Sequence, residues 1–206
     1  MAFALATTSP DVHSIADAVD RKYNHLHTLE CNFTEIYSGA GTDRSESGTL
    51  WLKKPGKMRW EYRSPREKLF VGDGKYAWFY VPGEQQVRRT EIRKLEDLRS
   101  PLAFLLGKTK LEKELRGLSV VPDAKPVDVG DIVLKGVPKA MAYRATEVLL
   151  EITPNDWIRR IVISEADGSK TEYLFRDQKE DVTVPDQRFA FTVPSGVEVV
   201  DENFGQ

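Results

Sequence analysis

Residues 48–65 read GTLWLKKPGKMRWEYRSP, and this stretch decides the fold. Its second half alternates large apolar with charged side chains, namely Met58, Trp60 and Tyr62 with Lys57, Arg59 and Glu61. A period of two is typical of a β-strand with one buried face. Leu50 and Leu52 indicate a preceding strand, and Pro55-Gly56 predicts the turn between the two.

The same pattern extends in both directions. Residues 69–82, LFVGDGKYAWFYVP, predict a hairpin at Gly72-Asp73-Gly74, and 86–92 predict another strand. Upstream, Leu29, Cys31 and Phe33 alternate with polar residues, and the Gly/Ser/Asp-rich residues 38–48 predict a turn. Further strands are expected near 120, 132–134, 146–153, 157–164, 170–176, 189–194 and 197–200. About ten strands in sequential hairpins predict one curved antiparallel sheet.

Two segments have helical periodicity instead. Residues 11–27 carry apolar side chains at spacings of four, four and three, with Ser9 as the expected cap and Pro10 in the first turn. Residues 101–107, PLAFLLG, predict a short apolar helix, and Leu111, Leu115 and Leu118 suggest further helical turns. The fold class is therefore mainly β with helices.

Composition narrows the possible functions. The 206 residues carry 30 basic and 32 acidic side chains, and this balance gives no reason to expect a nucleic-acid partner. The single cysteine forms no internal disulfide, and no apolar stretch is long enough to span a bilayer. Residues 1–6, MAFALA, are interpreted as the remainder of a secretory signal or as a disordered end, and residues 7–206 as one domain.

Catalytic and metal-binding patterns are missing from the sequence. The three histidines lie near the first helix, and His25 and His27 are two residues apart, which on a helix places them on different sides. No zinc spacing, phosphate-binding glycine loop or hydrolase serine motif occurs. We therefore expect a protein that is not an enzyme and that uses no cofactor and no metal.

Apolar bulk on the strands is the more informative feature. Met58, Trp60 and Tyr62 share one face of their strand, and Trp78 and Tyr80 share a face of theirs. Such a sheet must cover its apolar face or bind a ligand with it. The pattern alone favours a filled core and leaves a lidded lipid cavity open.

Residues 48–65, 69–82 and 189–197 (FAFTVPSGV) together resemble the signature of the LolA family of periplasmic lipoprotein carriers. The resemblance covers most of the chain and is weakest between about 115 and 146. It implies an incomplete, half-open β-barrel under an α-helical lid. It also implies a carrier that takes acylated lipoproteins from an inner-membrane ABC transporter to an outer-membrane receptor.

The resemblance also suggests roles for particular residues. The position before Pro55 is commonly an arginine that holds the lid closed by bonding helix carbonyls, and here it is Lys54. Lysine has three rotatable donors instead of a planar five-donor fork, so the latch is expected to be weaker. The lid is expected to comprise the first helix and residues 101–107, with Leu102, Phe104, Leu105 and Leu106, and to swing when cargo binds. The lipid cavity is expected to be lined by Phe33, Met58, Trp60, Tyr62, Leu69, Val71, Trp78 and Tyr80.

The resulting hypothesis is a monomeric periplasmic chaperone that buries acyl chains. Three alternatives remain at this point: an outer-membrane receptor or general lipid-binding domain of the same fold, a lipid hydrolase, and a plain docking domain. Cys31 lies inside a strand pattern and does not resemble the acylated cysteine that an anchored receptor would need.

Overall fold

A computed structural model describes residues 11–92, 105 and 110–201 of the chain. The helical elements are α1 (Val12–His25), α3 (Leu111–Glu114), η3 (Lys139–Met141) and η4 (Asp186–Phe189). The first six strands are β1 (Thr28–Gly39), β2 (Thr42–Lys53), β3 (Lys57–Ser64), β4 (Lys68–Asp73), β5 (Tyr76–Tyr80) and β6 (Gln86–Glu91). The other six are β7 (Leu115–Val120), β8 (Ile132–Pro138), β9 (Ala145–Ile152), β10 (Ile158–Glu165), β11 (Lys170–Glu180) and β12 (Glu198–Asp201).

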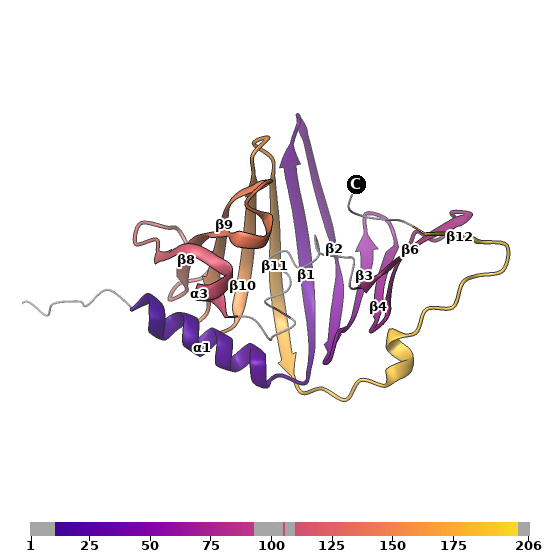
Figure 1. Cartoon of the computed structure of the whole chain (residues 1–206), viewed down its shortest axis with the longest axis horizontal. Coiled ribbons are helices and arrows are strands. Elements are labelled where there is room, and N and C mark those ends of the chain that lie inside the picture. Colours follow the sequence, from indigo (N-terminus) through magenta and orange to yellow (C-terminus); the bar gives the residue numbers. More distant parts are fainter. Residues whose placement is uncertain (1–10, 93–104, 106–109, 202–206) are drawn as a thin grey trace, which may run out of the picture.

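The strands form one twelve-stranded sheet in the order β12-β6-β5-β4-β3-β2-β1-β11-β10-β9-β8-β7. The long β1–β2 hairpin stands in the middle of the sheet, and β11 returns beside β1 (Figure 1). Within the described residues β7 and β12 do not pair with each other, so the sheet stays open. The predicted single curved sheet is confirmed. One pairing departs from it, because β12 runs parallel to β6.

Helix α1 lies across one side of this sheet (Figure 1). It buries Ala16, Val19 and Tyr23 in the same apolar cluster as Phe33 and Phe175 of the sheet. Its amino end is capped by Asp11, whose carboxylate accepts hydrogen bonds from the backbone N–H groups of residues 13 and 14, so the cap is not Ser9. None of the described helices is long and apolar enough to cross a membrane.

The register of the ladders sorts each strand's residues onto two faces. Cross-strand partners in an antiparallel ladder share a face, and neighbours along a strand do not. Trp60 pairs with Phe70, and Phe70 pairs with Phe79, so these three rings lie on one face. This face also carries Phe33 and contacts α1, and we call it the inner face. Arg59, Val71 and Trp78 lie on the opposite, outer face.

The outer face of β2 to β5 is covered by the chain after β11. Trp51 packs with Val184 and Phe189 in a separate small cluster. The ring centroids of Trp78 and Phe191 are 5.3 Å apart. Residues 189–194, which the sequence predicts to be a strand, instead finish η4 and continue as an irregular segment. Their alternation reflects packing against the outer face without pairing.

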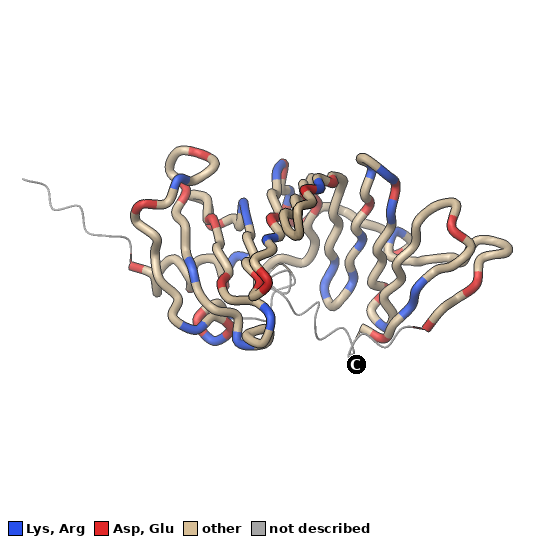
Figure 2. Tube along the Cα trace, turned by 90° about the horizontal axis from the view of Figure 1, so that it is seen from above, with Lys and Arg blue, Asp and Glu red and all other residues tan. Residues whose placement is uncertain are grey.

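Two other boundaries differ from the sequence prediction. Residues 38–48 belong mostly to the β1–β2 hairpin, whose turn is only Ala40-Gly41. Leu115 and Leu118 lie on β7 and do not continue the short α3. Acidic and basic residues are interspersed along the strands (Figure 2). In the hairpin, charged and polar cross-strand pairs such as Ser38 with Asp43 take the place of an apolar pattern.

Candidate functional site

Aromatic side chains cluster at the centre of the inner face. The ring of Phe33 lies edge-on to Trp60 and Tyr62, with centroids 4.7 and 4.9 Å away. Trp60 in turn contacts Tyr173 and Phe175, at 6.0 and 6.4 Å. Edge-to-face packing of this kind adds to the stabilisation from burial. The cluster joins β1, β3 and β11, three strands that surround the middle of the sheet.

The inner face of β3 to β5 remains partly accessible next to this cluster. Met58, Tyr62, Phe70 and Phe79 are only half-buried, whereas Phe33 is 2% exposed. Met58, Tyr62 and Phe70 pack against the buried core cluster, so the accessible apolar surface continues into the core. A continuous apolar surface that is partly exposed is a suitable binding surface for hydrocarbon.

Lys54 connects the sheet to the end of α1. Its ammonium donates hydrogen bonds to the backbone carbonyls of Tyr23 and Asn24, the latter at 3.1 Å. The last carbonyls of a helix have no partner within the helix and carry its negative dipole end, so a cation there is stabilising. The Tyr23 hydroxyl accepts a hydrogen bond from the backbone N–H of Ile158 at 3.1 Å. Lys54 and Tyr23 therefore hold the carboxyl end of α1 on the inner face.

This contact fits the latch that Lys54 was predicted to provide, because α1 is the first helix, which was expected to form part of the lid. Of the expected lid residues only Leu105 is described, and it is 2% exposed within the inner-face core cluster. Leu102, Phe104 and Leu106 lie outside the described residues.

A carboxyl group lies beside the aromatic cluster, on the same face. Glu35 Oε2 accepts a hydrogen bond from the Tyr62 hydroxyl at 2.7 Å, and Oε1 accepts one from the Tyr173 hydroxyl at 3.4 Å. Burial raises the pKa of Glu35 above its usual range, against the opposing effect of the Tyr62 hydrogen bond. Burial also raises the pKa values of both tyrosines, so they remain hydroxyl donors.

The predicted cavity residues separate into two groups. Phe33, Met58, Trp60 and Tyr62 share the inner face, as the cavity hypothesis requires. The other four, Leu69, Val71, Trp78 and Tyr80, lie on the outer face. They therefore do not share a face with Phe33 and Trp60, because the register places Phe70 and not its neighbours opposite Trp60.

Sequence reasoning missed the residues that replace them. Phe70 and Phe79 lie within the quoted aromatic stretch, but residues 69–71 and 76–80 are apolar without strict alternation. Both faces of these strands carry apolar side chains, so the sequence alone does not say which face is inner. Once the β3–β4 pairing is known, the position opposite Trp60 identifies Phe70 directly.

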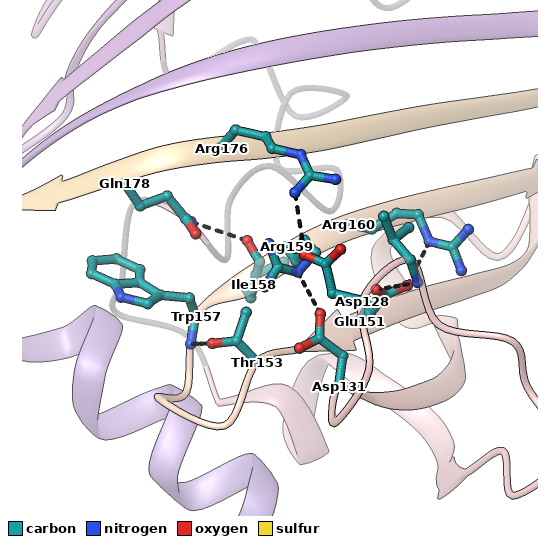
Figure 3. Close-up of polar contacts among 11 residues, drawn as sticks. Asp128, Asp131, Glu151, Thr153, Trp157, Ile158, Arg159, Arg160, Arg176 and Gln178 are labelled. Carbon is teal, nitrogen blue, oxygen red and sulfur yellow. Dashed lines mark hydrogen bonds and ion pairs between the residues drawn. The ribbon is translucent and has the colours of Figure 1, made fainter.

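A second polar cluster lies on β8 to β10 and serves the structure. Asp131 and Glu151 have side chains that are each 1% exposed, and they pair with Arg159 and Arg160 (Figure 3). Burial raises the pKa of Glu151, whose Oε1 also accepts a hydrogen bond from the backbone N–H of Val127 at 2.7 Å. The cluster thereby fastens the loop before β8 to the sheet.

The described residues offer no group of three or more histidine, cysteine, aspartate or glutamate side chains that could hold a metal ion. Cys31 is 1% exposed, and burial raises the pKa of its thiol, so the reactive thiolate is disfavoured.

Comparison with known proteins identifies the family. The family model described as outer membrane lipoprotein carrier protein LolA matches residues 24–192. The chain belongs to the LolA family. An outer-membrane lipoprotein carrier protein of Dechloromonas aromatica is 31% identical to it over 194 residues, covering 91% of this chain and 89% of the relative. One of Chromobacterium violaceum is 30% identical over 174 residues, covering 84% and 81%.

Solved structures show that the LolA fold is shared more widely. An uncharacterized conserved protein of Thermus thermophilus superposes with a TM-score of 0.59 at 13% identity, covering 92% of this chain and 98% of the other. The lipoprotein LppX of Mycobacterium tuberculosis gives 0.53 at 13% identity, covering 86% and 100%. At such identities the similarity concerns the fold alone.

Proposed function

We propose that the protein is a periplasmic lipoprotein carrier that shelters the acyl chains of its cargo against the inner face, without chemical conversion. The observation that carries the proposal is the half-buried apolar surface of Met58, Phe70 and Phe79, next to a helix that Lys54 holds in place. Membership of the LolA family and the carrier names of its relatives support the same function.

The energetics are adequate for such a carrier. Burying an acyl chain of about 14 methylenes is favourable by about 11 kcal/mol before costs, at about 0.8 kcal/mol per CH₂. In the present conformation α1 covers part of the inner face, with Ala16 fully buried and Val19 1% exposed. Cargo must therefore displace α1 or other covering residues, and the energy used in opening lowers the net affinity. Because the Lys54 latch is weak, the carrier can open both to take up its cargo and to release it.

The partners follow from this role. The carrier receives acylated lipoproteins from an inner-membrane ABC transporter and passes them to an outer-membrane receptor, and it works as a monomer. A receptor or general lipid-binding domain of the same fold is the second candidate, and it would bind the same acyl chains without moving between membranes.

Two neighbouring residues provide the test. Phe70 faces inward and Leu69 faces outward, both are half-buried on β4, and either can be replaced by glutamate. We expect Phe70→Glu to abolish the binding of a fluorescent fatty acid, because a carboxylate on the acyl surface opposes burial of hydrocarbon. Leu69→Glu should bind within about twofold of wild type, since about 0.4 kcal/mol separates such affinities.

Circular dichroism checks that both variants are folded. Equal loss of binding in two folded variants would contradict the inner-face assignment. Wild-type protein that binds no fatty acid would contradict the carrier function itself.

A further inference from the structure

The inner face changes character along β11. Phe175 is fully buried in the core cluster, and Tyr173, two residues away on the same face, is half-buried. The two rings are parallel within 6°, with centroids 6.4 Å apart. On β1 and β11 the inner face carries polar groups from this point on: Glu35 lies opposite Tyr173 in register, and Tyr37 lies opposite Thr171. An acyl chain lying along this face would therefore meet its first polar group at Tyr173.

Glu35 is costly to keep in this place. A carboxyl group beside aromatic rings loses hydration, and burial is the main reason for its raised pKa. The nearby Lys68 does not fully offset the cost of burying Glu35, because its ammonium forms an ion pair with Glu46. A half-buried carboxyl beside an apolar surface is a candidate for ligand recognition.

The two tyrosine hydroxyls are held differently. Tyr62 donates to Glu35 at 2.7 Å, a normal strong distance, whereas Tyr173 donates at 3.4 Å, near the limit for a hydrogen bond. The Tyr173 bond is weak enough to be exchanged for a better acceptor. Glu35 and Tyr62 then remain paired, so no buried group is left without a partner.

We propose that Tyr173 is the specificity-determining residue of the inner face, with its hydroxyl donating a hydrogen bond to the carbonyl oxygen of the cargo's acyl ester. Glu35 and Tyr62 are positioning residues that place this hydroxyl at the end of the apolar surface. This inference rests on the proposed carrier function. The site would then recognise the ester group that attaches the acyl chain as well as the hydrocarbon of the chain.

The experiment compares two lipids that differ only at this linkage. Monopalmitoylglycerol has an ester carbonyl, and 1-O-hexadecylglycerol has an ether with no carbonyl. Wild-type protein should bind the ester about tenfold more tightly in a competition assay against a fluorescent fatty acid, the ratio expected for one hydrogen bond from a half-buried donor. Tyr173→Phe should bind both lipids with about the affinity of wild type for the ether.

Tyr37→Phe is the matched control, since it removes a hydroxyl from the same face of β1 two residues beyond Glu35. It should keep the tenfold preference. A structural role of Tyr173 would lower stability or both affinities together and would leave the ratio of the two affinities unchanged.

The outcomes separate the two proposals. If wild type binds both lipids equally, or if Tyr173→Phe keeps the ester preference, the recognition of the linkage is refuted while the carrier function stands. If wild type binds neither lipid, the carrier function is refuted and this inference is refuted with it.

Discussion

Replacing Lys54 by methionine removes the ammonium group that holds the carboxyl end of α1 and keeps most of the side chain's apolar stem. The change breaks two charge-assisted hydrogen bonds, to the carbonyls of Tyr23 and Asn24. Such bonds contribute about 1.5 to 3 kcal/mol each when well shielded, and partial exposure reduces the sum here to about 2 kcal/mol. The equilibrium for local opening of α1 should therefore rise by about 30-fold.

Amide hydrogen exchange followed by mass spectrometry measures this opening. Peptides from the last turn of α1, where the Leu26 N–H donates to the Lys22 carbonyl at 3.2 Å, should lose protection in the Lys54→Met protein. Lys54→Arg should keep it, since the guanidinium offers five donors to the same carbonyls. Unchanged protection in Lys54→Met would refute the latch.

The neighbouring lysine supplies the control. Lys53 lies on β2 next to Lys54, donates to the Val184 carbonyl at 2.9 Å and pairs with Asp186 at 2.7 Å. In Lys53→Met the backbone amides around η4 on the outer face should exchange faster, and those of α1 should stay protected. Loss of protection in α1 after either substitution would indicate general destabilisation instead of a specific latch.

Three further predictions concern the sheet. The pKa of Glu35 is raised in the folded protein, so ionising this carboxyl costs stability once the pH rises above its pKa in the unfolded chain. Glu35→Gln should therefore gain stability relative to wild type between pH 4 and pH 7, as measured by urea unfolding. Arg159→Met leaves the buried Asp131 without its partner and should lower the free energy of unfolding by about 3 kcal/mol. Gly48→Ala should be destabilising by more than about 1 kcal/mol, measured in the same way, because its Cβ would lie 1.8 Å from the Glu61 carbonyl oxygen.

Each of these has an outcome that contradicts it. If the difference in unfolding free energy between Glu35→Gln and wild type is the same at every pH, the pKa of Glu35 is not raised by folding. The control is Arg63→Met, because the Arg63 side chain is 62% exposed and lies 3.9 Å from the Glu61 carboxylate, and this change should cost less than about 0.5 kcal/mol. If Arg159→Met costs no more than this control, the structural role of Arg159 is contradicted. Unaltered stability of Gly48→Ala would mean that β2 and β3 can separate there freely.

The sequence predicts elements well where apolar side chains on one face alternate with charged side chains on the other. Met58, Trp60 and Tyr62 illustrate this, since their alternation identifies both the strand and its inner face. It predicts poorly where both faces carry apolar side chains. In residues 69–80 the outer face packs against η4 and Phe191, so apolar residues on both sides hide which face is inner.

The site was predictable to a similar extent. Lys54 could be named from the resemblance, and it does donate hydrogen bonds to the end of a helix, namely α1, which was expected to form part of the lid. Glu35 and Tyr173 could not be named, because they are more than a hundred residues apart in sequence and meet only through the β1–β11 pairing. The long β1–β2 hairpin was also missed, since its cross-strand polar pairs look like a turn when read along the chain.

Photo-crosslinking tests the central claim most directly. A fatty acid with a diazirine in its chain is bound to the wild-type protein, irradiated, and located residue by residue by mass spectrometry. The account predicts label on Met58, Phe70 and Phe79 of the inner face. Label concentrated instead on Leu69 and Trp78 of the outer face would contradict it.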